Sequence, residues 1–72
     1  MLFNGNVVTI DDSGRERYGE KVEYSFTNKE KLIEYMLTHD YVFLGEYDDG
    51  NLIFNKTLNH WTHKRLTLRA KK

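Results

Sequence analysis

A chain of 72 residues without a cysteine must hold its fold together with one hydrophobic core. Disulfides and thiolate zinc sites are excluded, and this residue usage is typical of a protein of the reducing cytoplasm. Hydrophobic residues make up 39% of the chain and aromatic residues 14%, which indicates a globular chain. No apolar run approaches the ~20 residues that cross a bilayer, so we expect no membrane partner. The sequence therefore predicts a single domain over residues 1–72.

The first part of the chain has the pattern of a β-hairpin. Residues 6–10 are rich in β-branched side chains, which favour strands, and residues 11–14 form a turn signal. Apolar and polar residues then alternate, so that four aromatic or aliphatic side chains are expected to share one buried face. These are Tyr18, Val22, Tyr24 and Phe26.

One helix is predicted over residues 28–39. Thr27 and Glu30 have the spacing of a capping box, in which each side chain bonds the backbone amide of the other. No glycine closes the helix, so His39 or Asp40 is expected to end it in a left-handed conformation. The apolar residues form one stripe that should pack on a sheet, namely Leu32, Ile33, Met36 and Leu37.

Two apolar segments, 41–44 and 52–54, flank Asp48-Asp49-Gly50 and indicate a second hairpin. We favour a three-residue loop with a bulge, which pairs Leu44 with Phe54, over a two-residue loop that shifts the pairing by one residue. Either loop leaves both strands apolar on both faces. Such strands are usually central in a sheet.

A last strand is predicted over residues 61–69, with Leu66, Leu68 and Ala70 pointing inward. The order of elements is then β-β-α-β-β-β. The expected fold class is α+β, with one amphipathic helix packed on a small, largely antiparallel sheet.

The net charge of zero hides an asymmetry along the chain. Residues 1–49 contain all eleven acids and five bases, a net charge of −6, whereas residues 50–72 contain six bases and no acid. In one interpretation the two parts attract each other within the folded chain. In the other, the basic part binds an anionic partner.

The sequence predicts neither an enzyme nor a cofactor or metal site. The Asp11-Asp12 and Asp48-Asp49 pairs precede glycines in turns, where aspartate is the expected residue. His60 and His63 are expected on opposite faces of a strand, and no cysteine or nearby carboxylate completes a zinc site. No nucleophile, base and orienting group can be assembled from the remaining residues.

The last strand contains the clearest candidate binding surface. Its outward face carries Trp61, His63, Arg65 and Arg69, and Lys56 and Lys64 add to the basic segment. Aromatic and arginine side chains on a sheet bind nucleic acids, and the same residue types are enriched at protein contacts. In a third interpretation this strand lies at the edge of the sheet, and its charged side chains only protect it against aggregation. Alternatively, Trp61 anchors the core at the edge of the sheet.

The acidic part of the chain contains a second candidate surface. Its carboxylates would imitate phosphate groups on a basic partner surface. The candidates are Glu46, Asp48 and Asp49 in the second hairpin, with Glu20 and Glu23 in the first.

In its size, its lack of proline and cysteine, and its bias towards residues with AT-rich codons, the chain is similar to small accessory proteins of phages and mobile elements. The resemblance implies a protein of the bacterial host cytoplasm and assigns no residue role. Our leading prediction is a non-catalytic protein that binds and blocks a host protein, such as one that handles nucleic acid. The alternative is a small DNA- or RNA-binding protein that uses the basic C-terminal strand. A third hypothesis is a homodimer, in which the −6 and +6 parts of neighbouring chains meet.

Overall fold

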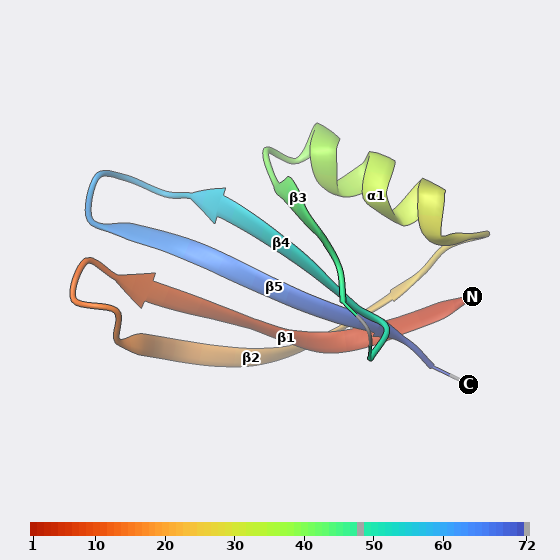
Figure 1. Cartoon of the computed structure of the whole chain (residues 1–72), viewed down its shortest axis with the longest axis horizontal. Helices are drawn as coiled ribbons and strands as arrows, with labels where there is room; N and C mark the ends of the chain where they lie inside the picture. The colour runs from red at the N-terminus through yellow and green to blue at the C-terminus, as the bar shows by residue number, and fades with distance from the viewer. Residues whose placement is uncertain (48, 72) are drawn as a thin grey trace.

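One helix and five strands form the fold of this protein (Figure 1). The computed structural model describes residues 1–47 and 49–71, without the side chain of Tyr18. The predicted α+β class and the order β-β-α-β-β-β are confirmed. The elements are β1 (Leu2–Asp11), β2 (Glu16–Ser25), α1 (Lys29–Thr38), β3 (Val42–Glu46), β4 (Asn51–Thr57) and β5 (Thr62–Ala70).

The strands form one sheet in the order β2-β1-β5-β4-β3, and every neighbouring pair is antiparallel. β5 therefore lies at the centre, between β1 and β4. The interpretation of this strand as a charge-protected edge is wrong, because the end of the chain returns between the two hairpins and pairs on both sides. The prediction that both strands of the second hairpin are central holds for β4 and is wrong for β3, which is an edge.

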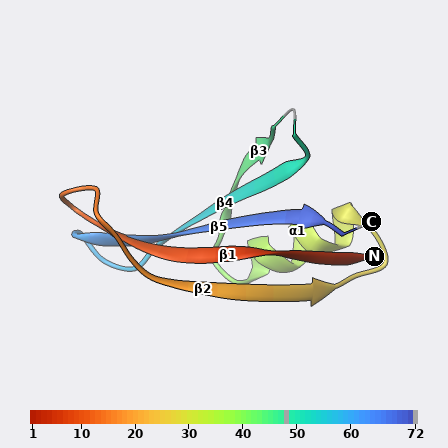
Figure 2. The ribbon, with the colours of Figure 1, turned by 90° about the horizontal axis from the view of Figure 1, so that it is seen from below.

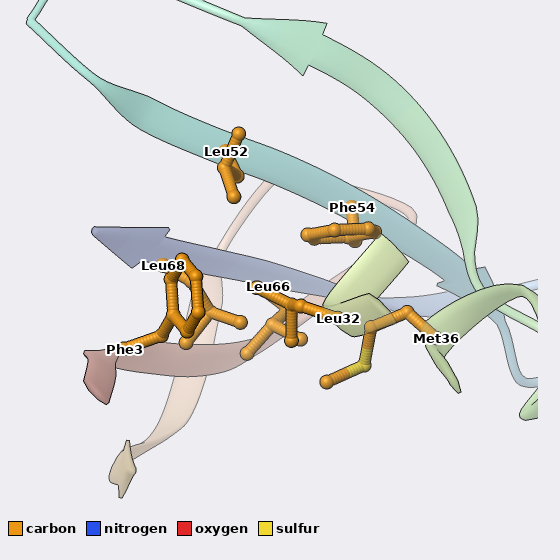
Figure 3. Close-up of a cluster of buried hydrophobic side chains, with 7 residues drawn as sticks. All are labelled: Phe3, Leu32, Met36, Leu52, Phe54, Leu66 and Leu68. Atoms are coloured by element: carbon orange, nitrogen blue, oxygen red, sulfur yellow. The ribbon is translucent and has the colours of Figure 1, made fainter. Parts of the chain in front are cut away.

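The helix connects the two edge strands and packs on one face of the sheet, which we call the helix-side face. Its Leu32 and Met36 are buried against side chains of β1, β4 and β5 (Figure 3). Val22, Tyr24 and Phe26 pack half-buried beside this cluster, as predicted; the side chain of Tyr18 lies outside the described part. The buried cluster comprises Phe3, Leu32, Met36, Leu52, Phe54, Leu66 and Leu68.

The helix begins one residue later than predicted. Asn28 is the N-cap, and its side-chain oxygen accepts a hydrogen bond from the amide of Lys31 at 2.9 Å. The Thr27 capping box is therefore wrong, because the Asn28 carboxamide caps the first turn instead. At the other end the prediction is confirmed: His39 is the C-cap and Asp40 has a φ of 68°.

The buried stripe of the helix is narrower than predicted. Leu32 and Met36 are buried and Ile33 is half-buried, but Leu37 is 52% exposed. Successive helical residues are about 100° apart, so a stripe centred on Leu32 and Met36 turns Leu37 towards the solvent. The prediction that Leu37 packs in the core is wrong.

A β-bulge decides which side chains of β3 face the core. Phe43 pairs with Phe54, and the register shifts between Phe43 and Gly45, which has a φ of 135°. The expected pairing of Leu44 with Phe54 is therefore wrong. The bulge places the larger Phe43 ring 5.1 Å from the Phe54 ring and leaves Val42 and Leu44 exposed.

The helix covers only one half of the sheet. In Figures 1 and 2 the tips of the β1–β2 and β4–β5 hairpins extend together beyond the helix. Both faces of this half are open, and so is the whole sheet face opposite α1, which we call the far face. The candidate binding residues are distributed over these open surfaces.

Candidate interaction surfaces

The far face of β5 carries three of the predicted binding residues in one row. Leu66 and Leu68 point into the core, so the alternate residues His63, Arg65 and Arg69 point to the far face, as predicted. Because β5 is central, this row runs along the middle of the face. Half of the neighbouring far-face positions on β1 and β4 are amides, namely Asn4, Asn6, Asn51 and Asn55, and the others are Val8, Ile10, Ile53 and Thr57.

The charges of the far face are nearly balanced. Arg65 forms an ion pair and hydrogen bond with Glu16 at the start of β2. Arg69 lies in the same cross-strand row as Glu23, with Asn4 between them. Lys21, paired with Asn6, adds one further cation. The face therefore mixes both signs of charge with amides and aliphatic side chains instead of concentrating cations.

Trp61 lies in the turn before β5 instead of in the strand. The Asn59 side-chain oxygen accepts hydrogen bonds from the amides of Trp61 and Thr62, at 2.8 and 3.0 Å, which confirms the turn predicted at Asn59. The Trp61 side chain is 66% exposed, so its interpretation as a core anchor is wrong. A fixed backbone thus presents a large, exposed aromatic side chain at one end of the molecule.

An open depression beside this turn is lined by His60, Trp61 and His63, together with Ile10 and Asp12 of the first hairpin. The two histidines were expected on opposite faces of one strand. They line the same depression because His60 belongs to the turn, where strand alternation does not apply. Within the described residues, no group of three or more histidines, aspartates and glutamates is placed to hold a metal ion.

Lys56 and Lys64 lie on the helix-side face, away from the arginine row. They are direct cross-strand partners, and Thr9 and then Arg17 continue the same row across β1 and β2. The Lys56 ammonium lies 5.5 Å from the centre of the Tyr41 ring. Arg17 is 3.2 Å from Asp11, whereas neither lysine has an ion-pair partner within residues 1–47 and 49–71.

The acidic candidates of the second hairpin lie at the opposite end of β4 from Trp61. Seven strand residues separate the two turns, about 20 Å. Glu46 bonds Lys29 at 2.8 Å, and this hydrogen bond raises the pKa of the lysine. Asp49 accepts hydrogen bonds from the amide and side chain of Asn51. Asp48 lies outside the described residues.

The acidic pair of the first hairpin forms a turn. Asp11 accepts hydrogen bonds from the Ser13 hydroxyl at 2.6 Å and from the amides of Ser13 and Arg15 at 3.0 Å. These bonds, the Ser13 hydroxyl first, hold the pKa of Asp11 below its usual 3.8. Gly14 has a φ of 85° and completes the turn.

The predicted binding residues thus form three separate surfaces: the far-face row, the helix-side lysine pair and the acidic hairpin. The exposed edge of β3 is not evident from the sequence, because residues that are apolar on both faces predict a central strand. The exposed positions Val42 and Leu44 alternate with the half-buried Phe43, but an apolar run hides this alternation from the sequence.

In the described part of the chain, no helix is long and apolar enough to span a membrane. Comparisons of the chain with protein-family models, with curated proteins and with solved structures found no match.

Proposed function

We propose that this chain is a small non-catalytic protein that acts by occupying the surface of a partner protein. In the form that we favour, it is an accessory protein of the phage or mobile-element type, and it binds and blocks a host protein. The far face of the sheet, with the exposed Trp61 at its end, is the proposed contact surface.

The observation that carries this proposal is the balance of charge on the open far face. A surface that binds nucleic acid mainly neutralises phosphates and concentrates lysine and arginine. Here Glu16 binds Arg65, Glu23 shares a row with Arg69, and amides occupy many positions between them. Paired charges among amides and aliphatic side chains are suited to the mixed surface of another protein.

The position of Trp61 supports the same partner class. Tryptophan and arginine are the residue types most enriched among the side chains that dominate protein contacts. The Asn59 turn fixes the backbone of Trp61 by hydrogen bonds, so little backbone entropy would be lost when its exposed ring is covered.

The test is capture of a partner from a bacterial lysate with the tagged chain, with and without nuclease treatment. The proposal expects the same protein to be retained in both samples. Arg69→Ala should then weaken binding of the purified partner about fivefold or more, which corresponds to 1 kcal/mol. Lys31→Ala, which removes one exposed cation from the helix, is the matched control and should bind normally. Loss of the partner on nuclease treatment would contradict the proposal.

The row of Lys56, Lys64, Thr9 and Arg17 on the helix-side face favours a second candidate function, the binding of DNA or RNA. Lys56 and Lys64 are directly opposed on neighbouring strands, and like charges in this position destabilise a sheet. A bound phosphate would remove that repulsion, and Thr9 and Arg17 extend the row of donors across four strands.

This second candidate makes a different prediction for salt dependence. If the row binds phosphates, the logarithm of the affinity for single-stranded nucleic acid falls with the logarithm of the salt concentration. Replacing both Lys56 and Lys64 with alanine should make this slope shallower by about two. The control is the replacement of Lys29 and Lys31, two cations on the helix. An equal effect of both double variants would rule out a specific role of the row.

A further inference from the structure

The two edges of the sheet differ in their protection against pairing with another strand. β2 forms one edge and carries exposed charged residues along its length, namely Glu16, Arg17, Glu20, Lys21 and Glu23. β3 forms the other edge, and Glu46, its last residue, is its only charged residue. Charged side chains on an edge strand are a common protection against strand addition. The β2 edge has this protection by charge, whereas the β3 edge lacks it and has only the bulge at Gly45.

The unprotected edge is also apolar and fixed in place. Val42 and Leu44 are 59% and 54% exposed, and the exposed Tyr47 follows directly after the strand. Between them, Phe43 is held against Phe54 in the core. In Figure 2, β3 is the outermost strand of the sheet and rises away from the helix. An incoming strand would therefore meet an ordered edge with exposed apolar side chains.

Acidic residues flank this edge in the sequence. Residues 40–49 contain Asp40, Glu46, Asp48 and Asp49 and no base. Glu46 is partnered by Lys29, while Asp40 and Asp49 are exposed and form no ion pair within the described ranges. A second copy paired edge to edge would bring two such acidic segments together, and like charges on neighbouring strands are unfavourable. The complementary occupant has basic residues at its ends.

We propose that β3 is a strand-addition site for an extended segment of a partner protein, apolar at alternate positions and flanked by lysine or arginine. The segment pairs with Val42–Glu46 and adds a sixth strand to the sheet, while its basic ends lie beside Asp40 and Asp49. This inference rests on the proposed function in one respect, that the partner is a protein. It uses the edge of the sheet, where Val42 borders the far face opposite Asn55.

The test is titration of the ¹⁵N-labelled chain with the synthetic peptide KKVTVTVKK, followed by amide chemical shifts and hydrogen exchange. We expect the shifts and the slowed exchange to concentrate at residues 42–46. The peptide EEVTVTVEE, with the same strand and reversed charge, should bind more weakly at low salt and equally at high salt. A peptide with proline at the central valine should lose binding, because proline removes a backbone donor and breaks the ladder.

Two pairs of variants separate edge pairing from general attraction. Leu44→Ser removes an exposed apolar contact and should lower peptide affinity about fivefold, the upper value for one cross-strand pair. Val8→Ser, on the interior strand β1, is its control and should leave affinity unchanged. Asp49→Asn removes one negative charge beside the edge and should weaken binding at low salt. Glu23→Gln removes one negative charge from the β2 edge and should not change peptide binding.

Two results would overturn the inference. If millimolar peptide leaves the amides of residues 42–46 unchanged, β3 is not a strand-addition site. Concentration-dependent dimerisation that protects the same amides would make a second copy the occupant. Either result leaves the proposed function intact, because capture of a partner and its sensitivity to Arg69→Ala are measured independently of the peptide.

Discussion

Replacing Gly5 with alanine should destabilise the fold, because this glycine lies where β1 and the central strand β5 approach each other closely. A Cβ atom built at Gly5 would lie 1.8 Å from the backbone oxygen of Thr67. That oxygen belongs to a strand paired on both sides, so it cannot move aside as a flexible side chain would. The same pairing holds the far-face row of β5 in register.

The magnitude follows from two opposing effects. Glycine within a strand is destabilising by about 0.5–1 kcal/mol relative to alanine, so the substitution would be favourable without the clash. Overpacking costs about 1–3 kcal/mol, and a clash with backbone belongs at the upper end. The net loss should be about 2 kcal/mol, or about 8–16 °C in Tm for a domain of this size. The total stability of such a chain is about 4–11 kcal/mol.

Thermal and urea denaturation, followed by circular dichroism, measure this loss. The matched control is Gly19→Ala on β2, where the nearest atom to the new methyl is Val8 Cγ1 at 3.6 Å, an ordinary contact. Gly19→Ala should leave the Tm unchanged or raise it. If Gly5→Ala melts at or above the wild-type temperature, the close approach of β1 and β5 is wrong.

Three further predictions concern the helix and the first turn. Asn28→Ala should cost about 0.5–2 kcal/mol in denaturation experiments while Thr27→Ala is nearly neutral, and the reverse order would contradict the Asn28 cap. Met36→Ala should cost about 2–5 kcal/mol and the exposed Leu37→Ala less than about 0.5 kcal/mol; equal losses would refute the narrow buried stripe. Because the pKa of Asp11 is lowered on folding, its contribution to stability is present above pH 3.8 and is lost as the pH falls through the lower folded value. The Tm of Asp11→Asn should therefore fall less than that of the wild type as the pH is lowered through this range. If both proteins show the same dependence of Tm on pH, Asp11 makes no such contribution.

The local features of the fold could be predicted from the sequence. Hydrophobic periodicity identified the helix and assigned Leu66 and Leu68 to the core, and turn residues such as Gly14 and Asn59 marked the ends of the hairpins. These features depend on residues close together in the chain. The helix cap shifted by one residue because Thr27 and Asn28 are both good capping residues, and only the geometry of the chain entering the helix selects between them.

The order of the strands could not be predicted in the same way. β5 pairs with β1 across about sixty residues, and no local pattern distinguishes a central position from an edge. The bulge at Gly45 turned Leu44 outward, since a shift of one residue exchanges the two faces of a strand. The far-face row containing Arg65 was predicted correctly, but the separation of this row from Lys56 and Lys64 required the tertiary structure.

The proposed contact surface is tested most directly by the affinity of the captured partner for the wild-type chain and for Trp61→Ala, measured at two salt concentrations. A protein contact centred on this end of the far face predicts a loss of 2 kcal/mol or more, about thirtyfold in Kd, with weak salt dependence. Trp61→Phe, which keeps an aromatic ring, should recover part of the loss. Unchanged affinity of Trp61→Ala would contradict a protein contact at this end of the far face. Wild-type binding that falls steeply with salt, as phosphate contacts require, would contradict it too.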